Sequence, residues 1–308
     1  MYLEHYGLRE LPFSLTPDTS FFFTYGHYRD ALNTLLIALH NGEGFIKVIG
    51  EVGTGKTLLC RKLLASLEDK YVTAWLPNPS LTPSALLLSL AEELGMEMPH
   101  KLLGYRALKA IGERLITLNA QGKRVMLCID EAQAMPEQSL ETLRLITNLE
   151  TEKRKLLQVV LFGQPELEAQ LRKPSVRQLR QRITFSYTLQ PIDRQGMEAY
   201  VQHRLLVAGN QGQVHFTREA FRRLYQGSGG YPRLINILAH KALLLGYGQG
   251  VLRIDTPQVN NAIADTEGAF QLPRWPLRLL QPRLLLALGS SSLLLALLLH
   301  LFAIGVLP

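Results

Sequence analysis

Cysteine is scarce in this sequence, with only Cys60 and Cys128 among 308 residues. Both lie within apolar runs, where a free cysteine commonly serves as a small core residue. So few cysteines argue against a fold held together by disulfides, and they do not predict a metal site. The sequence therefore favours two buried thiols in a reducing compartment.

Acidic residues are also few relative to basic ones. There are 26 Asp and Glu against 33 Lys and Arg, which gives a formal net charge of +7. This balance permits a nucleic acid or an anionic membrane as partner and does not choose between them. The first ten residues, MYLEHYGLRE, lack the basic and apolar segments of a secretory signal, so no signal peptide is expected.

Charged residues are missing altogether from Leu284–Leu307, a stretch of 24 residues. Because about 20 apolar residues span a bilayer, this stretch predicts a transmembrane helix; a buried helix of a soluble core is the alternative. The preceding residues 269–283 form a linker containing Pro273, Pro276 and Pro282 and three arginines, Arg274, Arg278 and Arg283. Since the arginines flank only the N-terminal side, the rest of the chain is expected in the cytoplasm. His300 either stays neutral within the span or faces a partner helix.

The strongest motif follows a short apolar strand predicted at Phe45–Ile49. Residues 50–57, GEVGTGKT, fit the pattern G-x-x-x-x-G-K-[ST] of a phosphate-binding loop. Its glycines let the backbone turn its N–H groups toward phosphate oxygens, and the helix that follows directs its positive end at the same anion. Lys56 is expected to reach the β- and γ-phosphates, and Thr57 to bind Mg²⁺. The residues predicted to bind nucleotide here are Gly50, Glu51, Val52, Gly53, Thr54, Gly55, Lys56, Thr57 and Leu58.

Two acids follow the next strongly apolar run, Val125–Ile129, which is typical of a strand buried on both faces. Open α/β sheets bind ligands at the carboxyl ends of their strands, where these acids would lie. Asp130 suits a Mg²⁺ ligand close to Thr57. Glu131 can polarise a water molecule for attack on the γ-phosphate.

A polar side chain also follows the strand predicted at Leu156–Phe162. Gln164 could hold the attacking water between Glu131 and the γ-phosphate, or it could be a turn residue before a helix started by Pro165. Residues 174–183, PSVRQLRQRI, predict a basic helix that enters a strand at Ile183–Leu189. Its arginines could be a solvated face or could include a functional residue.

From Pro191 onward the pattern predicts only helices, at residues 193–208, 217–226, 232–245 and 256–266, with Thr217 and Thr256 as caps. Arg233 lies in the first turn of the third, where a cation opposes the helix dipole. A nearby nucleotide phosphate would explain that placement. The aromatic N-terminal residues 1–29 could pack over the main core or form a wall for the adenine ring.

The order of these motifs resembles the AAA+ ATPases. Within them, YGLRELPFSLTPD, GEVGTGKT, LCIDEAQ and GQPELEAQL resemble the ExeA/GspA group of secretion ATPases, and most closely the MSHA (mannose-sensitive haemagglutinin) pilus biogenesis ATPases. The resemblance implies a sensor-1 role for Gln164, a sensor-2 role for Arg233 and an arginine finger at Arg182, with Arg180 as second choice. It also implies ATP, Mg²⁺ and a ring of subunits, with a hexamer as the expected ring.

Together these features predict an α/β P-loop fold with a parallel sheet flanked by helices, a small all-α lid and a C-terminal transmembrane helix. The expected segments are an ATPase core at 1–190, a lid at 191–268, the linker at 269–283 and the span at 284–307. The expected function is a bacterial inner-membrane ATPase that assembles or remodels a type IV (MSHA-like) pilus or type II secretion envelope complex. The alternatives are a DNA-binding regulator of transposition, which an intramembrane tail disfavours, and a nucleotide-dependent scaffold with little turnover.

Overall fold

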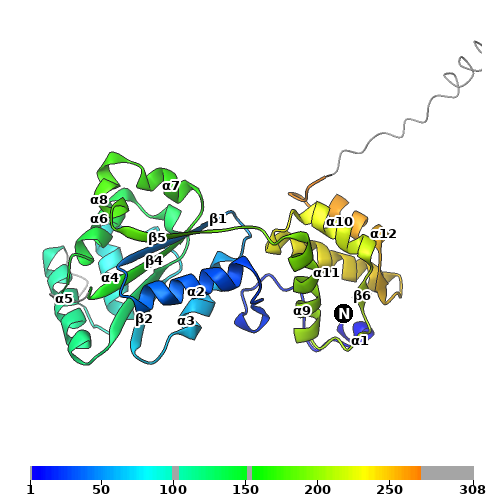
Figure 1. The fold of residues 1–308 in the computed structure, drawn as a ribbon, viewed down its shortest axis with the longest axis horizontal. Helices are drawn as coiled ribbons and strands as arrows, with labels where there is room; N and C mark the ends of the chain where they lie inside the picture. Colours follow the sequence, from blue (N-terminus) through cyan, green and yellow to red (C-terminus); the bar gives the residue numbers. More distant parts are fainter. Residues whose placement is uncertain (1, 99–103, 151–154, 272–308) are drawn as a thin grey trace, which may run out of the picture. The chain divides into compact units, whose positions relative to one another are not determined.

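The computed structural model describes residues 2–98, 104–150 and 155–271, and the chain up to Phe270 forms one compact unit. A parallel five-stranded sheet with the strand order β2-β3-β4-β1-β5 lies within it (Figure 1). The strands are β1 (Phe45–Gly50), β2 (Tyr71–Leu76), β3 (Arg124–Ile129), β4 (Leu157–Gly163) and β5 (Ile183–Leu189). Because the strands are parallel, the loops after the adjacent β3, β4 and β1 emerge at one edge of the sheet.

Helices cover both faces of this sheet. They are α2 (His27–His40), α3 (Lys56–Ser66), α4 (Pro83–Glu93), α5 (Tyr105–Ala120), α6 (Glu137–Ile146), α7 (Glu166–Leu171) and α8 (Arg177–Arg180). On β4, Val160 and Phe162 pack with α2 and α3, whereas Val159 and Leu161 pack in a second cluster with α4, α5 and α6. This alternation explains why the central strands are continuous apolar runs.

Four longer helices follow β5: α9 (Arg194–Val207), α10 (Arg218–Ser228), α11 (Pro232–Gly248) and α12 (Thr256–Ala264). The expectation of helices alone was wrong, because β6 (His215–Phe216) pairs in parallel with β7 (Arg253–Ile254). Strands of two residues are too short to show an alternating pattern. Thr217 caps α10 as predicted, but Asp255 caps α12, and the Gln258 side-chain oxygen accepts a hydrogen bond from the Asp255 backbone N–H. A carboxylate followed three residues later by Gln forms a capping box, which outcompetes Thr256.

The N-terminal residues pack into the main core, as one of the two expected alternatives had it, and several of them contact α9 and α11. In α1 (Leu3–Tyr6), the Tyr6 hydroxyl donates to the Leu243 carbonyl at 2.9 Å. Tyr2 Oη and His240 Nδ1 are also 2.9 Å apart. These aromatic side chains are buried against α11 by their apolar bodies while their hydroxyls find partners.

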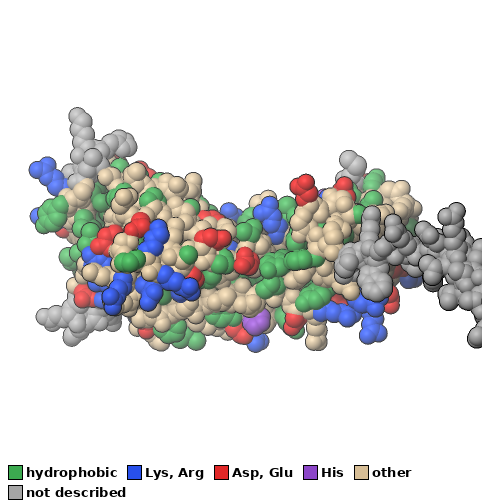
Figure 2. Space-filling model, turned by 90° about the horizontal axis from the view of Figure 1, so that it is seen from above, with side chains coloured by type: hydrophobic (Ala, Val, Ile, Leu, Met, Phe, Trp, Pro, Cys, Tyr) green, Lys and Arg blue, Asp and Glu red, His purple; other side chains and the backbone are tan. Residues whose placement is uncertain are grey.

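The predicted basic helix is divided into the 3-10 turn η3 (Pro174–Val176) and the single helical turn α8. Surface charge of both signs is mixed: Lys and Arg side chains lie beside Asp and Glu side chains over much of the face in Figure 2. In the described part of the chain, no helix is both long and apolar enough to cross a bilayer. The predicted span at 284–307 and most of the predicted linker lie outside the described residues.

Candidate nucleotide site

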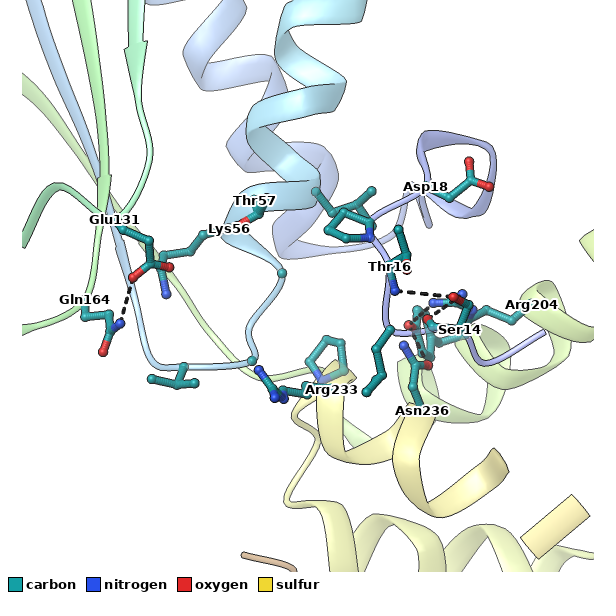
Figure 3. A pocket seen from close by; sticks show the side chains of 18 residues that line it. Ser14, Thr16, Asp18, Lys56, Thr57, Glu131, Gln164, Arg204, Arg233 and Asn236 are labelled. Atoms are coloured by element: carbon teal, nitrogen blue, oxygen red, sulfur yellow. Dashed lines mark hydrogen bonds between the residues drawn. The ribbon is translucent and has the colours of Figure 1, made fainter. Parts of the chain in front are cut away.

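A pocket of about 400 Å³ opens at the carboxyl edge of the sheet (Figure 3). Its walls come from four places: the loop between β1 and α3, the residues after β3 and β4, the N-terminal segment 14–18, and the helices α9 and α11. Seven predicted residues line it together with Arg233: Val52, Gly53, Gly55, Lys56, Thr57, Leu58 and Glu131. Gln164 lines it as well. The structure thus gathers predicted residues that are far apart in the chain, from Val52 to Arg233.

The loop requires glycine where α11 approaches it. Gly53 has φ +82° and Gly55 has φ +88°, both in the left-handed region that side chains disfavour. A Cβ on Gly53 would lie 2.9 Å from the Cβ of Arg233, and the Arg233 backbone N–H donates to the Gly53 carbonyl at 3.2 Å. The close approach of α11 therefore brings Arg233 to the pocket from a helix distant in sequence.

Lys56 is buried at the first position of α3. Its Nζ donates to the carbonyls of Gly50 at 2.8 Å and Glu51 at 3.0 Å. Burial lowers the pKa of Lys56, and the carboxylates of Glu131 and Asp130 oppose that shift. Within the described residues this buried ammonium bonds neutral carbonyls and no anion, so phosphate oxygens would suit it.

Thr57 and Asp130 join the two motifs that the sequence identified separately. The Thr57 hydroxyl donates to Asp130 Oδ2 at 2.6 Å, although 73 residues separate them. Burial raises the pKa of Asp130, while the bond from Thr57 opposes the shift. A hydroxyl and a carboxylate are oxygen donors, the type that Mg²⁺ binds in combination with phosphates and water. These two residues fit the predicted metal position.

Glu131 leaves β3 in an unusual backbone conformation. Its φ of +50° is the only positive value at a non-glycine position in the described residues. Its Oε2 accepts one hydrogen bond from Gln164 Nε2 at 2.9 Å and another from Gln133 Nε2 at 2.5 Å. Strained backbone at a strand end is often retained for function. The structure therefore joins Glu131 and Gln164 as expected from their neighbouring strands, and adds Gln133.

A second unanticipated residue, Arg204 of α9, holds the N-terminal wall of the pocket. This side chain is buried, and its guanidinium donates to the carbonyls of Pro12 and Ser14 and to the Tyr200 hydroxyl. The Tyr200 hydroxyl in turn donates to Asn236 Oδ1 on α11. The segment 14–18 thereby forms a wall of the pocket, but none of its five residues is aromatic, so it is not the aromatic wall offered as one alternative. Phe21 and Phe22, by contrast, are buried in the core.

Arg182 and Arg180 lie outside this pocket, before β5 and thus at the opposite, amino edge of the sheet. The Arg182 guanidinium donates weakly to the Arg144 carbonyl and to Thr147 Oγ1, each at 3.5 Å, and Arg180 is exposed. Gly50, Glu51, Thr54 and Asp130 also do not line the pocket. Three of them hold residues that do, because the Gly50 and Glu51 carbonyls accept from Lys56 and Asp130 accepts from Thr57. The Glu51 backbone carbonyl accepts hydrogen bonds from both Lys56 Nζ and the Thr54 hydroxyl.

Comparison with known proteins agrees with this geometry. An AAA domain matches residues 39–171. General secretion pathway protein A of Aeromonas hydrophila is 40% identical over 295 residues, which cover 95% of this chain and 52% of that protein. These two similarities support an AAA+ ATPase of the ExeA/GspA group. The chain spans about half the length of this relative.

Solved structures share the fold at low sequence identity. The Aeropyrum pernix ORC2 protein in its ADP form has a TM-score of 0.64 at 15% identity, over 82% of this chain and 72% of that chain. The Aeropyrum pernix ORC1 protein in complex with DNA has a TM-score of 0.59 at 20% identity, over 82% and 68%. The Thermotoga maritima RuvB branch migration motor has 0.51 at 19% identity, over 77% and 67%. These similarities confirm the predicted α/β AAA+ P-loop fold. At such low sequence identity they indicate the fold alone and no activity.

Proposed function

We propose that this ExeA/GspA-group protein binds ATP with Mg²⁺ and hydrolyses it to ADP and phosphate. The observation that carries the proposal is the 2.6 Å bond between Thr57 and Asp130, with Lys56 and Glu131 lining the adjacent pocket. It supports a single site that combines a phosphate-binding loop, oxygen ligands for Mg²⁺ and a carboxylate base.

Each residue has a distinct role in the proposed reaction. The loop N–H groups, Lys56 and Arg233 hold the phosphates, while Thr57 and Asp130 hold Mg²⁺, which neutralises phosphate charge. Glu131 accepts the proton of the attacking water as the new O–P bond forms. Gln164 helps to orient that water, and ADP leaves as the β–γ bridging P–O bond breaks.

The proposal includes a neighbouring subunit. Because Arg182 and Arg180 lie outside their own pocket, either can serve the pocket of another copy, with Arg182 as first choice. Such an arrangement would build a ring, for which we propose six subunits as in many AAA+ proteins. In each subunit, residues 1–190 would form the ATPase core and residues 191–268 the lid.

The cellular setting is proposed from the relative's name and from the sequence. That relative is a general secretion pathway protein, and residues 284–307 of this chain lack charged side chains. We propose an inner-membrane protein with a single C-terminal span and a cytoplasmic ATPase region. Its work would be the assembly or remodelling of a type II secretion or MSHA-like pilus envelope complex, with proteins of that complex as partners.

The test of the activity is phosphate release from ATP by the full-length protein in detergent or membranes. We expect release that requires Mg²⁺ and that Lys56→Ala abolishes by preventing tight ATP binding. Tight binding without phosphate release, with co-purified envelope proteins present, would favour the scaffold alternative. Affinity capture from membranes, followed by identification of the co-purified proteins, would test the proposed partners.

A further inference from the structure

Gln133 lies two residues after Glu131, in the short 3-10 turn η2 (Ala132–Ala134). Its side-chain nitrogen donates to Glu131 Oε2 at 2.5 Å, and its side-chain oxygen accepts from the Gln164 backbone N–H at 3.0 Å. Gln164 Nε2 donates to the same Glu131 oxygen at 2.9 Å and so completes the set of hydrogen bonds among the three residues. Three residues on two adjacent strand ends are thus joined in one ring of hydrogen bonds.

The position of Gln133 is itself fixed from two sides. Its backbone carbonyl accepts from Gln170 Nε2 of α7 at 2.8 Å. Its Oε1 lies close to Gly163 at the end of β4: a Cβ built on Gly163 would be 3.4 Å from this oxygen. Gln133 does not line the nucleotide pocket, whereas Glu131 and Gln164 do. Any effect of Gln133 on the reaction therefore passes through these two residues.

Glu131 needs such support. Its side chain has three rotatable bonds, and fixing a long side chain in one rotamer costs conformational entropy. Its backbone also has the positive φ noted above, so the strand no longer sets the direction of the side chain. Two amide donors on Oε2 supply the direction that the backbone does not.

We propose that Gln133 is a positioning residue for ATP hydrolysis, which holds the Glu131 carboxylate toward the attacking water. The inference rests on the proposed role of Glu131 as base. Gln133 fixes Oε2 and simultaneously sets the backbone of Gln164, so that both pocket residues keep one relative arrangement. The water proton passes to Glu131 and does not pass to Gln133, whose amide is neutral and remains so.

The experiment compares Gln133→Met with Gln138→Met in the full-length protein. Methionine retains the length of glutamine and removes both hydrogen-bonding atoms; Gln138 is an exposed residue of the nearby α6 and serves as the matched control. We expect Gln133→Met to lower kcat roughly 10-fold, the scale of one hydrogen bond to a charged group, with KM and ATP affinity unchanged. Gln138→Met should change none of the three.

A second variant keeps the test independent of packing. Gln133→Glu retains the acceptor for the Gln164 N–H and places a second carboxylate against Glu131, so kcat should fall further than with methionine. In the Glu131→Gln background, Gln133→Met should cause no additional loss, because no carboxylate remains to be positioned.

Two results would contradict the positioning role of Gln133. An unchanged or increased kcat of Gln133→Met, at normal ATP affinity, would overturn the positioning role. So would a full 10-fold additional loss in the Glu131→Gln background, since Gln133 would then act without Glu131. If Glu131→Gln alone retained the wild-type rate, the assignment of the base would fail first, which separates that failure from a failure of Gln133.

Discussion

Asp130 and Glu131 are adjacent carboxylates with different surroundings. Asp130 is buried and bonded to Thr57, which suits a group that stays near a cation. Glu131 lines the pocket and bonds to neutral amides, which leaves it able to accept a proton. The left-handed backbone at Glu131 separates the two side chains. One strand end therefore serves the proposed metal and the proposed water with consecutive residues.

Glu131→Gln should separate ATP binding from hydrolysis. The substitution keeps the shape of the side chain and removes the base, while the phosphate-binding loop and the Thr57–Asp130 pair are unchanged. We expect near-normal ATP affinity and a turnover reduced roughly 10²-fold or more, the scale for loss of a positioned base. Nucleotide titration and phosphate release measure the two quantities. Hydrolysis at the wild-type rate would show that another group takes the proton.

Local elements could be predicted where their sequence signals are local. The strand at 183–189 and the cap of α10 by Thr217 were predicted at their observed positions. The phosphate-binding loop was recognisable because its backbone geometry demands glycines at fixed spacing. Gln133 stood within the quoted motif LCIDEAQ, but a glutamine has no single role that spacing could reveal. Arg204 gave no signal, since its partners are backbone carbonyls about 190 residues away.

Arg204 should matter for the connection between the N-terminal segment and α9. Its guanidinium bonds the carbonyls of Pro12 and Ser14 and lies 4.6 Å from the centre of the Phe21 ring. Removing this buried side chain leaves those carbonyls unpaired and a void, at a cost of about 2 kcal/mol. Arg204→Ala should therefore lower the melting temperature and weaken ATP affinity, because residues 14–18 form a wall of the pocket.

Thermal denaturation with and without ATP measures both effects. Arg222→Ala, at an exposed position of α10, is the matched control and should change neither quantity. Arg204→Lys should recover only part of the loss, since an ammonium cannot reproduce the planar fork of hydrogen bonds. Normal ATP affinity in a destabilised Arg204→Ala protein would limit Arg204 to a role in folding.

At the scale of the assembled molecule, Arg182 should act in trans. An arginine that stabilises charge on the γ-phosphate contributes roughly 10³–10⁵ in rate in other NTPases. Mixed rings of Arg182→Ala and Glu131→Gln subunits should recover activity wherever an intact Glu131 site meets an intact Arg182. Phosphate release is followed across mixing ratios, with Arg177→Ala, an exposed residue of α8, as control. Absence of recovery despite demonstrated co-assembly would argue against a trans role, whereas recovery confined to Arg180→Ala would move the finger by two residues.

The last prediction concerns the proposed membrane anchor. A helix over 284–307 would be about 36 Å long at 1.5 Å per residue, enough to cross a hydrocarbon layer of roughly 30 Å with modest tilt. Full-length protein should therefore remain in the membrane pellet through high-salt and carbonate washes. A truncation after Gly268 should leave the pellet and still bind ATP, because every residue of the pocket precedes that position. It should fail in secretion or pilus assembly, since that work requires attachment to the envelope. Release of the full-length protein by salt alone would mean that basic surface charge holds it, and would favour the DNA-binding alternative.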